Sequence, residues 1–109
     1  MKGLVYLIFA ILFEVAGTTS MKLSEGFTKL IPSVLLFIFY ALSFAGLTLT
    51  LKWIDVSIAY AIWSGLGTLL IVAIGIFFFN EPVTAVKILC IALIIVGAVG
   101  LNLAGVQHL

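Results

Sequence analysis

The stretch LIPSVLLFIFYALSFAGLTLTL, residues 30–51, contains no charged side chain. A helix rises about 1.5 Å per residue, so about 20 apolar residues cross a hydrocarbon core that is roughly 30 Å thick. The stretch is therefore long and apolar enough to span a membrane as a helix.

Three further apolar stretches have a similar length, and the charged residues lie almost entirely in the gaps between them. These gaps also carry turn formers, including Gly26 and Pro82,. We predict an all-α integral membrane protein with a single domain over residues 1–109. Because the loops are only a few residues long, neighbouring helices must run antiparallel. The four predicted transmembrane helices cover residues 4–21, 30–51, 57–79 and 85–105.

The composition excludes several other classes of protein. Hydrophobic residues make up 65% of the chain and charged residues 8%, whereas about a quarter of a soluble domain is charged. A net charge of +1 without a basic patch gives no indication of nucleic-acid binding,. The single cysteine excludes an intrachain disulfide and a thiolate metal site,. Short loops leave no extramembrane domain for an enzyme site, so we expect no catalysis, metal or cofactor.

The start of the chain also imitates a secretory signal peptide, because Lys2 precedes an apolar run,. That run continues beyond Glu14, and no clear A-x-A cleavage site follows it. We therefore expect a retained transmembrane helix.

Glu14 interrupts the first apolar stretch about ten residues from its start, which places it near the bilayer midplane,. The other charged residues lie at segment ends. A carboxyl inside the membrane costs at least a few kcal/mol and is by default a candidate for function. The alternative is a protonated Glu14 that only makes a hydrogen bond between helices.

The residues around Glu14 predict a pocket with aromatic walls. Mostly small residues share its helix face in the first segment, although close packing would explain them equally well. Aromatic residues lie inside the second and third segments, rather than only at their ends. The predicted pocket residues are Leu7, Ala10, Gly17, Thr18, Tyr40, Ser43, Phe44, Tyr60 and Trp63.

An ionised carboxylate with aromatic neighbours is a suitable receptor for a hydrophobic organic cation, because ring faces also attract cations. No lysine or arginine lies deep in the membrane to bind an anion. Desolvation favours the neutral form of a carboxyl, so Glu14 can hold a proton instead. A site that takes protons or cations in competition, and opens to one side at a time, lets a proton gradient drive cation export.

Small residues in the last two segments suggest how such a protein would move and assemble. Gly65 and Gly67 interrupt the third helix and could form its hinge, or could only admit a neighbouring helix closely,. Cys90 and Gly97 are seven residues apart on one face of the fourth helix, which suits a contact between subunits,.

The lysines are almost evenly divided between the two membrane sides. Lys2 and Lys52 share one side, and Lys22, Lys29 and Lys87 share the other. Because such a small bias orients a chain weakly, it predicts insertion in both orientations and an antiparallel homodimer. The alternatives are a fixed topology or a partner chain of opposite bias.

Two stretches, EVAGTTSMKLSEGFTKLIPS (residues 14–33) and AYAIWSGLGT (residues 59–68), resemble the small multidrug resistance family of bacterial exporters. The resemblance covers essentially the whole chain and is greatest to the EmrE-like multidrug branch. It implies an antiparallel dimer in the bacterial inner membrane that exports quaternary ammonium compounds and other aromatic cations against protons. On the matching positions, Glu14 would be the shared site, Thr18 would lie near it, and Gly65 to Gly67 would form the hinge. Tyr40, Phe44, Tyr60 and Trp63 would line the pocket.

The branch assignment rests mainly on Gly17, Thr18 and Thr19. Members similar to the guanidinium exporters usually carry a tryptophan and small residues here, whereas this chain has Gly17. Leu4 replaces a tyrosine that is frequent in the multidrug branch, and Cys90 replaces an expected glycine. A guanidinium, polyamine or osmolyte exporter is therefore the alternative within the family, and a heterodimer with a second family subunit is possible. In other classes, the alternatives are a passive cation or proton channel and a structural membrane subunit.

Overall fold

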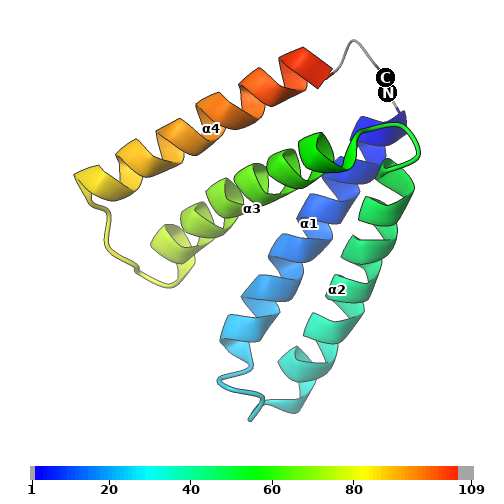
Figure 1. Cartoon of the computed structure of the whole chain (residues 1–109). Helices are drawn as coiled ribbons and strands as arrows, with labels where there is room; N and C mark the ends of the chain where they lie inside the picture. The colour runs from blue at the N-terminus through cyan, green and yellow to red at the C-terminus, as the bar shows by residue number, and fades with distance from the viewer. Residues whose placement is uncertain (1, 106–109) are drawn as a thin grey trace.

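A computed structural model describes residues 2–105 of the chain, and over this range it contains four helices and no strand (Figure 1). The prediction of an all-α fold with four helices and short loops is confirmed. The helices are α1 (Lys2–Leu23), α2 (Leu30–Thr50), α3 (Val56–Phe78) and α4 (Ala85–Gly105).

Three of these helices, α1, α2 and α3, are long and apolar enough to cross a membrane, and α4 adds a shorter apolar run over Ala85–Leu101. Large apolar side chains cover the outer surface. Leu30 and Phe77, for example, are each 77% exposed. A surface of this kind is suited to lipid chains rather than to water.

The turn between α1 and α2 shows how the sequence ends a helix abruptly. Glu25, Gly26 and Phe27 all have positive φ angles, of 48°, 72° and 70°. The hydroxyl of Ser24 donates to the carbonyl of Met21 and accepts the Phe27 N–H, which ties the turn to the end of α1. Gly26 takes this left-handed conformation without a steric cost.

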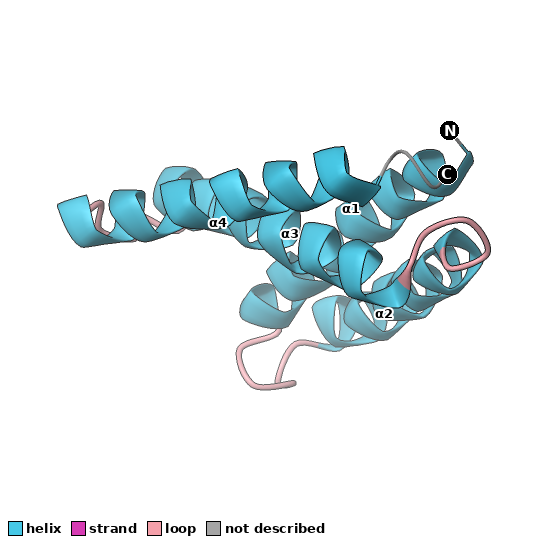
Figure 2. Cartoon of the chain, turned by 45° about the horizontal axis from the view of Figure 1, so that its top comes forward, coloured by secondary structure: helices cyan, strands magenta, loops and turns pink. Residues whose placement is uncertain are grey.

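The helices form two antiparallel pairs that splay apart. α1 lies along α2, α3 lies along α4, and a contact between α1 and α3 joins the pairs. Figure 1 shows the pairs diverging toward the end that carries the α1–α2 and α3–α4 loops, and Figure 2 shows α4 separated from α2. The two pairs therefore meet most closely around the first half of α1.

The core lies at this junction. Its buried residues come from α1, the α2–α3 loop and α3, and none of the α4 residues whose burial is described belongs to it. The only residue of α4 that is buried, among those described, is Ala98. The core residues are Leu7, Ile11, Val15, Ile54, Ala59 and Ile62.

Candidate functional site

The Glu14 carboxyl lies near the middle of α1, partly buried, and is held from one side by a chain of two hydroxyl groups. Thr18, one turn further along α1, donates its hydroxyl to Glu14 Oε1 at 2.9 Å. The Thr18 oxygen is also 2.6 Å from the hydroxyl oxygen of Tyr40 on α2. A threonine hydroxyl has a single proton to donate, so Tyr40 is the donor to Thr18 when Thr18 donates to an ionised Glu14. In that state both hydroxyl groups direct their protons toward the carboxylate.

The other oxygen of Glu14 faces α3 at Gly67. A Cβ atom at Gly67 would lie 3.0 Å from Glu14 Oε2, closer than ordinary van der Waals contact. The missing side chain thus allows the carboxyl to approach the backbone of α3. A cavity of about 230 Å³ adjoins this contact, and its lining consists of Glu14, Trp63, Ser64, Gly67, Thr68 and Ile71.

Four aromatic rings form a continuous row from α2 to α3 beside this cavity. Centroid distances are 6.1 Å from Tyr40 to Phe44, 6.2 Å from Phe44 to Trp63, and 5.5 Å from Trp63 to Tyr60. The Trp63 Nε1 atom is buried and has no hydrogen-bond partner within the described part of the chain. A buried N–H without a partner costs free energy, so it favours any acceptor that comes within reach.

The structure thus brings Glu14, Thr18, Tyr40, Phe44, Tyr60 and Trp63 of the predicted pocket into one region. The lysines all lie at or beyond the helix ends, so the carboxyl has no cationic side chain from its own surroundings. Chemically, this region combines a single anion with aromatic faces.

Other predicted pocket residues lie in the packing between helices. The Ser43 hydroxyl donates to the Ala10 carbonyl at 2.6 Å, and a Cβ at Gly17 would be 3.3 Å from the Tyr40 ring. Leu7 is 1% exposed and belongs to the core. None of these four residues lines the cavity beside Glu14. Their roles in binding stay predictions.

The predicted hinge and dimer residues have distinct surroundings. α3 continues without interruption through Gly65 and Gly67. A Cβ at Gly65 would lie 3.1 Å from Ile94 Cγ2 on α4, so this glycine admits a neighbouring helix closely. On α4, Cys90 is exposed, and nothing lies within 4 Å of a Cβ built at Gly97. The hinge and the subunit contact both remain predictions.

Sequence reasoning missed three residues that line the cavity, namely Ser64, Thr68 and Ile71. The signal was available in the helical period. Residues 64, 67, 68 and 71 share one face of α3, so identifying Gly67 as a neighbour of Glu14 would have placed the others in the lining.

Comparison with known proteins identifies the family. A sequence profile of the family described as "Small Multidrug Resistance protein" matches residues 2–94. The chain belongs to this family. The similarity to the family that the sequence motifs indicated is therefore confirmed.

Individual relatives match nearly the full chain. The Uncharacterized membrane protein YvaE of Bacillus subtilis is 62% identical over 104 residues, which cover 95% of this chain and 86% of YvaE. The Quaternary ammonium compound-resistance protein QacE of Escherichia coli is 46% identical over 94% of both chains. The Multidrug resistance protein EbrB of Bacillus licheniformis is also 46% identical, over 94% of this chain and 86% of EbrB. Because the chain belongs to this family and has several apolar helices, it is a multi-pass protein of the bacterial cell membrane.

Proposed function

We propose that this chain exports hydrophobic organic cations, including quaternary ammonium compounds, in exchange for protons. The observation that carries the proposal is the carboxyl of Glu14 beside a cavity and a row of aromatic rings. The carboxylate attracts a cation, and ring faces add about 2 kcal/mol in a dry site. The printed names of QacE and EbrB support the same class of substrate.

Proton exchange follows from the use of one group for two ligands. A protonated Glu14 carries no charge to attract a cation, so cation binding releases its proton. When the site opens to the opposite side, a proton displaces the cation and resets the carboxyl. The hinge at Gly65 and Gly67 would allow the opening to change sides. Such a cycle belongs to a transporter rather than to an enzyme, a passive channel or a structural subunit.

An antiparallel homodimer would complete the site. The cavity beside Glu14 is about 230 Å³, whereas sites for drug-sized molecules are about 300–1,000 Å³. A second copy would supply the remaining walls, and the outer face of α4 with Cys90 and Gly97 offers a surface for the contact. The near balance of the lysines at the two ends permits insertion in both orientations,.

The test uses this chain alone in proteoliposomes on a solid-supported membrane. We expect transient currents with tetraphenylphosphonium and benzalkonium, whose apolar groups match aromatic walls. Currents with guanidinium alone would contradict the proposed substrate class. A sustained current without exchange would indicate a channel. The absence of a current with tetraphenylphosphonium, benzalkonium and guanidinium would contradict a homodimer that works by itself.

The hydroxyl chain at Glu14 gives a second prediction. Thr18→Val keeps the shape of the side chain but removes the donor that holds the carboxylate in place. Binding of tetraphenylphosphonium at a fixed pH should weaken at least about ten-fold, since a hydrogen bond to a charged group contributes about 1.5–3 kcal/mol. Isothermal calorimetry of the variant and the wild type at that pH measures the loss.

Thr19→Val is the matched control, because the Thr19 hydroxyl donates to the Val15 carbonyl of its own helix. Tyr40→Phe should weaken binding in the same direction as Thr18→Val, but by less. An unchanged affinity in Thr18→Val, or an equal loss in Thr19→Val, would refute a role for the hydroxyl chain.

A further inference from the structure

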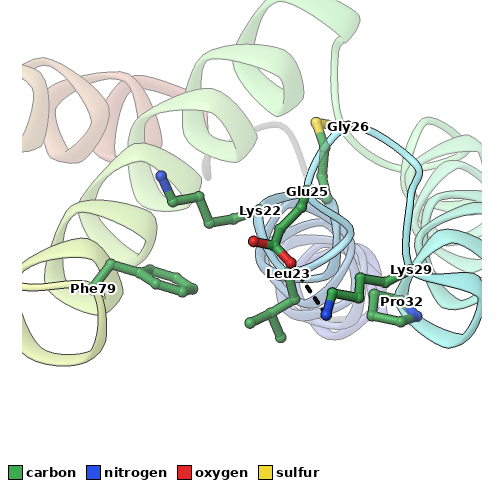
Figure 3. A pocket seen from close by; sticks show the side chains of 8 residues that line it. Lys22, Leu23, Glu25, Gly26, Lys29, Pro32 and Phe79 are labelled. Atoms are coloured by element: carbon green, nitrogen blue, oxygen red, sulfur yellow. Dashed lines mark ion pairs between the residues drawn. The ribbon is translucent and has the colours of Figure 1, made fainter.

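A groove of about 840 Å³ opens where the ends of α1 and α3 diverge, about two turns of α1 beyond Glu14,. Figure 3 shows that Lys22, Glu25, Lys29 and Phe79 surround it. Its lining comes from the last turn of α1, the α1–α2 loop, the first turn of α2 and the residue after α3. The lining residues are Met21, Lys22, Leu23, Glu25, Gly26, Lys29, Pro32 and Phe79.

The groove contains a cation that is not neutralised. The ammonium of Lys22 lies 5.9 Å from the centroid of the Phe79 ring. Within the part of the chain that the structure describes, no carboxylate lies within ion-pair distance of Lys22. A ring face attracts the ammonium but does not cancel its charge.

A second cation of the groove is only weakly held. Lys29 pairs with Glu25 at 3.4 Å, and their side chains are 60% and 65% exposed. An exposed pair of this kind contributes about 0–1 kcal/mol, so another anion can replace the carboxylate at little cost. Figure 3 shows the two ammonium groups on different sides of the groove, Lys22 toward Phe79 and Lys29 beside Pro32, so they supply positive charge from two sides.

A neighbouring cavity of about 270 Å³ extends this positive region. Lys22 and Phe79 line both hollows, and the second also contains Lys87 and Glu81. Lys87 donates to the carbonyl of Pro82 and makes no ion pair among the described side chains. Three lysines thus face two carboxylates at this end of the molecule.

The other walls of the groove are apolar, and the level of the groove matches the membrane surface. Met21, Leu23, Pro32 and Phe79 supply the apolar lining. Helices that span the hydrocarbon core end at the level of the lipid head groups. Basic pockets between helix ends at that level are suited to anionic head groups.

We infer that this groove binds an anionic glycerophospholipid such as phosphatidylglycerol. Lys22 would hold the phosphate, and Lys29 would add positive charge from the other side of the groove. The acyl chains would lie on the apolar side chains of α1 and on Phe77 and Phe78 at the end of α3, which are 77% and 76% exposed. A hydrophobic cation suits the groove poorly, because the uncompensated ammonium of Lys22 repels it. This inference stands apart from the proposed transport and needs only a membrane-embedded chain.

Native mass spectrometry of the full chain, titrated with phosphatidylglycerol or phosphatidylcholine in detergent, tests the site. We expect one retained phosphatidylglycerol per chain, and weaker retention of phosphatidylcholine. Lys22→Gln should weaken phosphatidylglycerol binding about five-fold, as expected for one lysine near an anionic lipid. Lys22→Arg should keep most of the affinity.

Lys52→Gln is the matched control, since Lys52 lies in the α2–α3 loop at the opposite end. It should leave the retained phosphatidylglycerol unchanged. Equal losses in Lys22→Gln and Lys52→Gln, or no loss in Lys22→Gln, would overturn the site. Displacement of the lipid by millimolar inorganic phosphate would also overturn it, because the groove would then bind any phosphate. Retained binding in the presence of phosphate supports recognition of the whole lipid.

Discussion

Replacing Glu14 with glutamine is expected to abolish the currents evoked by tetraphenylphosphonium, down to the level of protein-free vesicles. An amide has nearly the size of the carboxyl and can still accept the hydrogen bond from Thr18, so the local packing remains. It neither releases a proton nor carries a negative charge. Both halves of the proposed exchange are therefore lost together. The measurement is the peak current in proteoliposomes of equal protein content.

Two further substitutions make this result specific. Glu14→Asp keeps the carboxyl but withdraws it from Thr18, so we expect smaller currents rather than none. Glu25→Gln removes a carboxyl that is exposed and paired with Lys29 in the α1–α2 loop, and should leave the currents unchanged. Coupled exchange that persists in Glu14→Gln would refute the mechanism.

The four helices could be predicted from the sequence because the membrane imposes a simple rule. An apolar stretch must satisfy its backbone groups internally, so each stretch of the right length forms a helix. Charged residues and turn formers then mark the ends. The same rule says little about how the helices pair. Lipid is as apolar as leucine, so the hydropathy of a helix face does not show whether it meets a neighbour or the membrane.

Part of the site could be predicted for a similar reason. A charge inside an apolar stretch is costly, which made Glu14 evident from the sequence, and aromatic rings away from the helix ends indicated its surroundings. The contact between Glu14 and Gly67 could not be predicted from the sequence, because it depends on the rotation of α3 about its own axis.

Small residues were the least informative. Ala10 and Gly17 share the face of Glu14, yet they let α2 approach α1 closely. A Cβ at Gly46 of α2 would lie 3.3 Å from the Ala10 Cβ. The sequence alone does not show whether a small side chain makes room for a ligand or for a neighbouring helix. In a single chain, the distances to neighbouring atoms distinguish these two roles.

Gly67→Val is expected to weaken binding of tetraphenylphosphonium about ten-fold while the carboxyl of Glu14 remains present. The new Cβ would press on Glu14 Oε2, and its methyl groups would occupy part of the 230 Å³ cavity. Overpacking of this kind commonly costs about 1–3 kcal/mol. Gly67→Ala should have a smaller effect of the same kind. Affinity is measured by calorimetry in detergent, and folding by circular dichroism.

Ala92→Val is the matched control, because Ala92 is exposed in the single chain and lies away from the α4 face that carries Cys90 and Gly97,. Comparing affinity with transport rate also separates the two roles open to Gly67. If Gly67 acts mainly by making room beside Glu14, its substitution lowers the affinity first. If it acts mainly as a hinge, Gly67→Ala leaves affinity unchanged and slows exchange, since only the movement of α3 becomes harder. Wild-type affinity in Gly67→Val would show that the cation binds elsewhere.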